Sequence, residues 1–391
     1  MLSRIINIPS YLNLTNIGIV EFLFSLALLL GGFNLGGIPM SFFIWGSIIL
    51  IIFFRSKHLK IENYPPITLF FVYWIFHELI VIFFDANVNL KGYVEQLLLF
   101  VSFYFLYPYL NLNKLRGSLN WIAIIAIMGL LYQWSIISRG GSVHPLEIPG
   151  LSMSDNRLES LTIRPSSFFM EPAAYVAFML CPLALALLDK KYIWVIIIIL
   201  SIFLTTSTTG LILSFVILMM SLIIARVNKL SIFVMLISGF GLYYTLTHFD
   251  AFKTGVQKYE NTDIETTIRL VQGPKVVKTM ELYEYAFGAP YSSAYNYCKD
   301  RNVKRIVYYG NSVYMSTFWL LILRFGIAGL LLYLYIYYKI IQSSRLTIPL
   351  STCLLVVMFS SSYALGATYI FSLLFLLTIC RYEESIIPEI E

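Results

Sequence analysis

The sequence predicts an all-α, polytopic integral membrane protein with about twelve transmembrane helices. Three observations support this class. The 391 residues are 59% hydrophobic and only 12% charged, with a mean hydropathy of +0.78. Apolar runs of about 20 residues, the length needed to cross a bilayer, recur from one end of the chain to the other. Basic residues are concentrated in alternate connections between these runs, which is typical of membrane topology.

The apolar runs define the expected spans. The run 17–35 has Glu21 near its start and no small-residue cleavage site after it, so we expect a retained helix and not a removed signal peptide. The run 193–225 has 33 residues, about 50 Å as a helix, so we expect a hairpin that turns at TTSTTG (205–210). The expected spans are 17–35, 38–54, 66–84, 93–110, 119–137, 166–188, 193–206, 208–225, 231–248, 311–340, 347–361 and 363–380.

The Lys and Arg distribution predicts that both termini face the cytoplasm. One set of connections holds 13 basic residues: Arg4, Arg55, Lys57, Lys60, Lys114, Arg116, Lys190, Lys191, Arg226, Lys229, Lys339, Arg345 and Arg381. The short connections on the other side hold four: Lys91, Arg139, Arg157 and Arg164. Much of the net charge of +6 therefore follows topology, and we expect no nucleic-acid partner.

Two segments on the outer face interrupt the single membrane domain of residues 1–391. They are 138–165 and the 62-residue polar stretch 249–310, and long ordered loops usually carry function. In the second, Thr262 and Glu265 match a capping box, and Gly273-Pro274 is expected to end that helix.

A second helix is expected in KVVKTMELYEYAF (275–287), with Gly288 as its C-terminal stop. The loop thus predicts two short helices over the outer mouth of the bundle.

The stretch RPSSFFMEPAAY (164–175) places an arginine and a glutamate seven residues apart beside an apolar run. Pro165 suits a first helical position, so we expect a helix that begins there, with its free N–H groups and Arg164 forming an anion site. Glu171 would lie two turns deeper on the same side, where Pro172 loosens the backbone. Intramembrane carboxylates are usually functional. The alternative is a snorkelling arginine and a glutamate satisfied by a neighbouring helix.

Further charged and aromatic residues extend this candidate site. Arg269 can complete an anion clamp from the loop, or it is a solvated surface residue. Arg324 interrupts an apolar run before Gly326; it lies near mid-membrane if 311–340 is one straight helix, and is an interfacial anchor if 311–323 lies along the surface. Eight tyrosines of the large loop suit sugar rings or a membrane boundary equally well: Tyr259, Tyr283, Tyr285, Tyr291, Tyr295, Tyr297, Tyr308 and Tyr309.

Several kinds of chemistry have no sequence support. The four cysteines and four histidines are scattered without metal-ligand spacing, so neither a metal site nor a disulfide is expected. No nucleotide-binding motif is present, and no cofactor is expected. What remains is a set of outward arginines, one buried carboxylate and an aromatic lid. This set suits an anionic lipid-linked substrate with a phosphate leaving group, stabilised by arginines while a carboxylate orients or deprotonates a hydroxyl.

Three local patterns resemble the O-antigen polymerases of the Wzy type and, more distantly, the O-antigen ligases. RPSSFFMEPAAYVAF is similar to the opening of a mid-chain helix in such polymerases. IETTIRLVQGPKVVKTMELYEYAFGAP resembles a loop in which an arginine precedes a helix and a glycine turn. NSVYMSTFWLLILRFGIAGLLLYL is similar to an Asn-led segment that runs into a Gly-x-x-Gly helix.

The resemblance implies a metal-independent glycosyltransferase at the periplasmic face of the bacterial inner membrane. It would transfer a growing glycan from undecaprenyl pyrophosphate to a hydroxyl of a new lipid-linked repeat unit, among membrane lipids and with a chain-length regulator protein as a partner. Arg164 and Arg269 would hold the pyrophosphate, Glu171 would serve the acceptor, and Asn311 would line the site. Arg324, Tyr291 and Tyr295 are the further candidates for substrate binding.

The chain departs from the ligase pattern at two positions. Gly310 stands where ligases carry a histidine before the asparagine, and Arg324 stands where an acidic residue is common. These departures favour a polymerase. An O-antigen ligase remains an alternative, and so does a lipid-linked oligosaccharide flippase, although paired halves with interrupted helices, frequent in transporters, are not visible.

Overall fold

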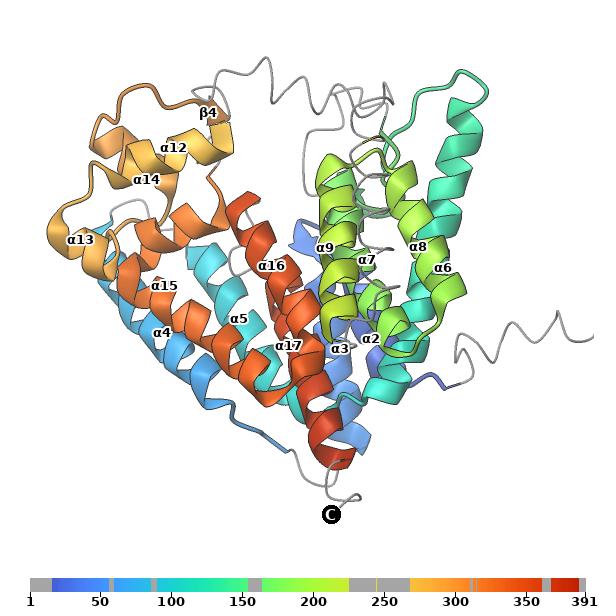
Figure 1. Cartoon of the computed structure of the whole chain (residues 1–391). Helices are drawn as coiled ribbons and strands as arrows, with labels where there is room; N and C mark the ends of the chain where they lie inside the picture. The colour runs from blue at the N-terminus through green and yellow to red at the C-terminus, as the bar shows by residue number, and fades with distance from the viewer. Residues whose placement is uncertain are drawn as a thin grey trace, which may run out of the picture.

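The computed structural model describes residues 16–55, 60–85, 90–153, 164–224, 244, 268–309, 312–313, 315–360 and 367–386, and these residues are predominantly helical (Figure 1). The helices that build the bundle are α2 (Ile19–Leu29), α3 (Met40–Arg55), α4 (Pro65–Phe84), α5 (Leu90–Leu106), α6 (Leu112–Ile137), α7 (Pro172–Leu188), α8 (Tyr192–Leu204), α9 (Thr208–Ile224), α15 (Thr317–Ser343), α16 (Ile348–Ser360) and α17 (Ala367–Ile386). Three short helices lie at one end of the bundle: α12 (Ile268–Val277), α13 (Leu282–Phe287) and α14 (Ala294–Asp300).

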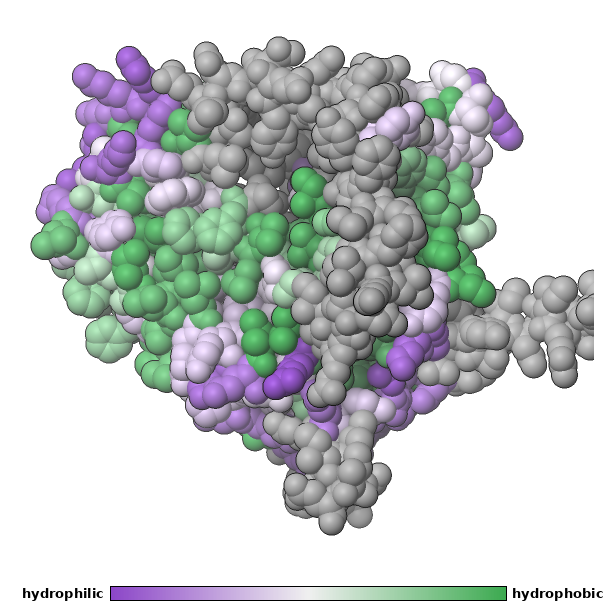
Figure 2. Space-filling model, in the orientation of Figure 1, coloured by the Kyte–Doolittle hydropathy of each residue, from purple (hydrophilic) through white to green (hydrophobic). Residues whose placement is uncertain are grey.

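The bundle has an apolar outer surface. Three helices, α4, α6 and α15, are long and apolar enough to cross a membrane, and several shorter apolar helices accompany them. Phenylalanines such as Phe54, Phe76 and Phe83 are exposed. Figure 2 shows a hydrophobic belt between two hydrophilic ends. A broad exposed apolar surface of this kind is typical of contact with lipid. The expected span 231–248 lies outside the described residues, apart from Tyr244.

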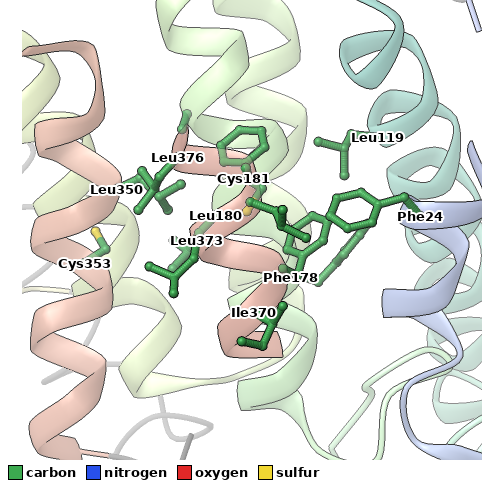
Figure 3. Packing of buried hydrophobic residues seen from close by; sticks show 14 of the residues in the cluster. Phe24, Leu119, Phe178, Leu180, Cys181, Leu350, Cys353, Ile370, Leu373 and Leu376 are labelled. Atoms are coloured by element: carbon green, nitrogen blue, oxygen red, sulfur yellow. The ribbon is translucent and has the colours of Figure 1, made fainter. Parts of the chain in front are cut away.

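Helix α17 forms the centre of the bundle. All of its residues from Ile370 to Cys380 are buried, as expected for a helix that is apolar all round. It packs against α2, α5, α6 and α15, and Phe371 stacks on Phe24 of α2 with ring centroids 4.7 Å apart. Figure 3 shows residues of α2, α6, α7, α16 and α17 meeting in this core. Helix α16 also connects α15 with α7 and α9, because it contacts all three helices.

The predicted break in the 33-residue run is confirmed. Helix α8 ends at Leu204 and α9 begins at Thr208. Thr206 takes a left-handed conformation (φ 53°), and the hydroxyl of Ser207 accepts from the Gly210 N–H at 3.2 Å, capping α9.

The first expected span is shorter than predicted. Helix α2 ends at Leu29, and the chain then forms a hairpin of β1 (Phe33–Leu35) and β2 (Ile38–Pro39). Gly36 and Gly37 both have positive φ, the requirement of a two-residue hairpin turn. Strand β3 (Ser152–Met153) pairs antiparallel with β1, Phe33 opposite Met153. The hairpin thereby attaches the loop after α6 to the bundle.

Ion pairs lie at the end of the bundle opposite α12–α14. They join residues of connections that the sequence predicted to lie together on the cytoplasmic side. Arg116 of α6 pairs with Asp189 after α7 at 3.2 Å, and Lys191 contacts the same carboxylate at 3.4 Å. Arg381 of α17 pairs with Glu62 at 3.2 Å. Its guanidinium also donates to the carbonyls of Tyr107 and Leu110.

The region of α12, α13 and α14, with strands β4 (Tyr308–Tyr309) and β5 (Ser312–Val313), is called the outer module here. The described part holds three short helices instead of the two expected. Helix α12 continues through Gly273-Pro274, which was predicted to end it. Gly273 has a packing role, because a Cβ there would lie 2.1 Å from Cγ of Trp319.

Helix α13 begins later than predicted, at Leu282. Glu281 and Glu284 form a capping box that fixes this start. Gly288 ends the helix with φ 99°, which confirms the predicted stop. Thr262 and Glu265, the capping box expected further upstream, lie outside the described residues.

Candidate functional site

The segment 164–171 is not helical, which corrects the predicted helix start at Pro165. Helix α7 begins at Pro172, with Glu171 in an extended conformation (φ −146°, ψ 154°) before it. A helix through this stretch would need an N–H from Pro172 to the Phe168 carbonyl, and proline has none; its ring also disfavours the helical conformation at the preceding residue. Glu171 is therefore at the helix N-terminus and not two turns inside it.

Gln133 of α6 holds this segment in place. Its side chain is 1% exposed, and its Oε1 accepts from the N–H groups of Ser166 at 2.9 Å and Ser167 at 2.7 Å. Its Nε2 donates to the His144 carbonyl at 2.6 Å. One amide therefore accepts from two buried N–H groups that have no helical hydrogen bond, because the segment is not a helix. The same amide joins the segment to the loop after α6.

A close approach to α6 completes this anchor. Ser167 has a left-handed backbone (φ 57°) and its hydroxyl points at Gly129, where a Cβ would lie 2.5 Å from it. The Ser167 carbonyl accepts from the Leu146 N–H at 2.8 Å. Arg164 and Glu171, both half-buried, thus lie at the two ends of a fixed eight-residue segment. The anion-favouring helix N-terminus is at Pro172, seven residues later than predicted.

Arg324 lies beside a break in α15 and is paired inside the protein. The helix is interrupted at Gly326 (φ 64°, ψ −171°), so the single straight helix is wrong. The guanidinium of Arg324 forms an ion pair with Glu78 of α4. Only 16% of the Arg324 side chain and 5% of the Glu78 side chain are exposed. Arg324 is therefore a buried ion-pair partner and not a free surface anchor.

The end of α13 fits into the break in α15. A Cβ on Gly326 would lie 2.4 Å from the Ala286 carbonyl, so only glycine allows this contact. The break frees carbonyl groups of α15, which need other donors. The Leu323 carbonyl accepts from the Ala289 N–H at 2.8 Å, and the Phe325 carbonyl accepts from the Tyr73 hydroxyl at 2.8 Å. The outer module is thereby attached to the bundle at Arg324.

A second attachment lies at Asp85, which follows α4. Its carboxylate accepts from the Ser292 N–H at 2.7 Å and from the Asn296 side chain at 3.4 Å. Inside the module, Glu284 is fully buried; it accepts from the Glu281 N–H at 2.9 Å and pairs with Arg301 at 2.8 Å. The position of the module on α4 and α15 is thus set by buried polar contacts.

Tyr291 and Tyr295 both belong to the outer module. The Tyr291 hydroxyl donates to Asp300; burial and this neighbouring carboxylate raise the pKa of Tyr291 to about 12. Tyr295 meets Tyr308 edge to face, with ring centroids 5.5 Å apart. The rings of Tyr295 and Tyr308 line an open pocket of about 350 Å³.

The candidate residues fall into two places at one end of the bundle. Arg164 and Glu171 lie at the two ends of the segment on α6. Arg324 lies where the outer module meets α4 and α15, and Tyr291 and Tyr295 lie within the module. Figure 1 shows α12–α14 at one side of the view and α6–α9 at the other. Arg269 is in α12, but its side chain lies outside the described residues, and so does Asn311. Among the described residues, no three His, Cys, Asp or Glu side chains come together as a metal site.

The sequence analysis did not identify two candidate functional residues, Glu78 and Gln133. Glu78 is a carboxylate in the apolar run PPITLFFVYWIFHELIVIFF, and the rule that selected Glu171 selects it too. Gln133 is a polar amide in the apolar part of α6, but nothing in the local sequence indicates its partners at Ser166 and Ser167.

Comparisons with known proteins gave no match: no protein-family model, no curated protein and no solved structure is similar to this chain. Function is therefore inferred from the residues and their placement.

Proposed function

We propose that the chain is an O-antigen polymerase of the Wzy type. The observation that carries the proposal is the segment 164–171, which carries Arg164 at its start and Glu171 directly before the N-terminus of α7, at the same end of the bundle as the outer module. A cation, a carboxylate and a helix N-terminus are the groups that transfer from a pyrophosphate donor to a hydroxyl acceptor requires. The sequence resemblance assigns the same segment to this reaction.

In the proposed reaction, the acceptor hydroxyl attacks the anomeric carbon of the growing glycan. The bond from that carbon to the pyrophosphate oxygen breaks, and undecaprenyl pyrophosphate leaves with the electron pair. Arg164, Arg269 and the positive end of the α7 helix dipole stabilise the charge that develops on this leaving group. Glu171 orients the acceptor hydroxyl and takes its proton. No metal or nucleotide takes part in the proposed step.

The other candidate residues have binding roles in the proposal. Tyr291 and Tyr295 contact sugar rings in the outer module, and Asn311 lines the site after strand β4. Arg324 acts together with Glu78, because its ion pair lies where the module joins α15. Its role is to keep the module in position over the lipid-linked substrate.

The proposed setting is the bacterial inner membrane. In this proposal the twelve expected spans put both termini in the cytoplasm and the segments 138–165 and 249–310 in the periplasm. The hydrophobic belt and the ion-paired opposite end support this orientation. The partners are then membrane lipids, the lipid-linked repeat units and a chain-length regulator.

Deletion of the gene in its host tests the proposal. We expect lipid A-core that carries single repeat units in place of a ladder. Arg164→Ala, Glu171→Ala and Arg269→Ala should reproduce this pattern at normal expression. Arg139→Ala is the matched control, because this exposed arginine belongs to the same loop but not to the segment 164–171; its ladder should be normal.

Other outcomes identify the alternatives. Loss of all capping, with polymer retained on undecaprenol, would indicate an O-antigen ligase. Accumulation of units on the cytoplasmic side would indicate a flippase. Normal ladders from all three alanine variants would refute the assignment of the site.

A further inference from the structure

The pocket of the outer module has a composition that suits one sugar ring. Its floor is formed by Cys298 and Val303, which are buried. Tyr295 and Tyr308 line it as one edge-to-face pair, with ring centroids 5.5 Å apart at an interplanar angle of 82°. At about 350 Å³, it lies within the usual range for a small-ligand site.

Polar groups surround the open side of the pocket. Lys299 and Asn302 complete its lining, and both are exposed. The Lys299 ammonium lies 5.1 Å from the centre of the Tyr295 ring. Apolar walls with a few polar groups at the rim match the two kinds of surface of a pyranose, whose C–H faces pack on aromatic rings while its hydroxyls need hydrogen-bond partners.

The charge of the module indicates which sugars fit. Residues 268–309 contain seven Lys and Arg but three Asp and Glu, a net charge of +4. The carboxylates are already engaged: Glu281 and Glu284 pair with Arg301, and Asp300 accepts from Tyr291.

The basic side chains beside the pocket are therefore left for a ligand. Within the described residues, no ion pair joins Lys299, Lys304 or Arg305 to a carboxylate. The interaction of Lys299 with the Tyr295 hydroxyl raises the pKa of Lys299, so its ammonium stays charged well above neutral pH. A cation beside two aromatic rings favours a ligand with both a sugar ring and an anionic group.

We propose that this pocket binds a carboxylated sugar of the glycan chain, with the ring packed against the Tyr295 and Tyr308 pair and the carboxylate on Lys299. This inference rests on the proposed function for the source of the glycan. The pocket then acts as a binding site for a repeat unit, separate from the bond-forming residues Arg164 and Glu171.

Saturation-transfer NMR on the full chain in lipid nanodiscs tests the proposal with methyl glucuronide and methyl glucoside, which differ in one carboxylate. We expect transfer to methyl glucuronide to exceed transfer to methyl glucoside several-fold. Lys299→Gln should remove this preference and leave weak binding of both sugars. Tyr295→Ala should abolish binding of both. Lys278→Gln is the matched control, because this exposed lysine of the module lies outside the pocket; it should behave as wild type.

Three results would overturn the proposal: equal transfer to the two sugars in the wild type, no change in Lys299→Gln, or displacement of methyl glucuronide by an equal concentration of inorganic phosphate. The last would show that the pocket binds phosphate. This assay measures binding alone. If the sugars do not bind as expected but the ladder still depends on Arg164 and Glu171, only the proposed sugar site is refuted. If the sugars bind as expected but the deletion strain has a normal ladder, only the proposed polymerase function is refuted.

Discussion

Replacement of Gln133 by leucine should release the segment that carries Arg164 and Glu171. The Gln133 amide accepts from two N–H groups whose residues, Ser166 and Ser167, are 2% and 0% exposed. Leucine has a similar volume but offers no acceptor. Each buried N–H left without a partner costs about 1–3 kcal/mol, so the loss of both hydrogen bonds should make opening of the segment easier by about 2–6 kcal/mol.

Hydrogen–deuterium exchange measures this change directly. A free-energy change of about 2–6 kcal/mol corresponds to about 30- to 20,000-fold faster exchange of the two serine amides. Asn120→Leu is the control, because Asn120 is a buried amide of the same helix that accepts from Trp194 at 2.9 Å; exchange in 164–171 should stay at the wild-type rate. Unchanged exchange in Gln133→Leu would refute the view that Gln133 holds the segment.

Three further predictions concern the outer module and its attachment. Gly326→Ala should destabilise the protein by at least about 1–3 kcal/mol in thermal unfolding, since its φ and ψ are almost exclusive to glycine, whereas Gly46→Ala, with open space around it, should not. Glu284→Ala should speed proteolysis of the module, because it leaves Arg301 without its buried partner; equal rates would contradict this. Burial raises the pKa of Cys298 to about 11, so its alkylation should be slow at pH 8 and accelerate toward pH 11.

The long apolar elements could be predicted from the sequence because they depend on composition. The expected span 66–84 corresponds to α4 at Pro65–Phe84, and the turn in TTSTTG follows from a run too long for one crossing. The predominantly apolar run 363–380 likewise overlaps α17 (Ala367–Ile386), which is buried from Ile370 to Cys380. In each case a bilayer or a core selects for the property that the sequence displays.

Breaks within helices were harder to predict because they depend on distant partners. Gly326 breaks α15 where the end of α13 packs into it, and a glycine in an apolar run does not indicate such a partner. Pro172 was different, since the local rule for proline could have placed the helix start there. Glycine and proline thus indicated where helices break or begin, and tertiary contacts determined the backbone conformation at those positions.

The polar and charged candidates also show that local sequence indicates an unusual residue but not its distant partner. Sequence reasoning selected Arg324 correctly as unusual, but not its partner Glu78, which is 246 positions away along the chain. Gln133 was missed because its role depends on backbone groups of a segment 33 residues later. Long-range pairing of this kind requires the fold.

Reconstitution tests the central claim most directly. The purified chain is placed in liposomes with undecaprenyl-pyrophosphate-linked repeat units from its host, and the products are separated by size. We predict a ladder of longer glycans with one undecaprenyl pyrophosphate released for each new linkage, and no ladder from Arg164→Ala or Glu171→Ala. Single repeat units that remain unjoined in the presence of the folded wild-type chain, or that only cross the bilayer, would contradict a polymerase.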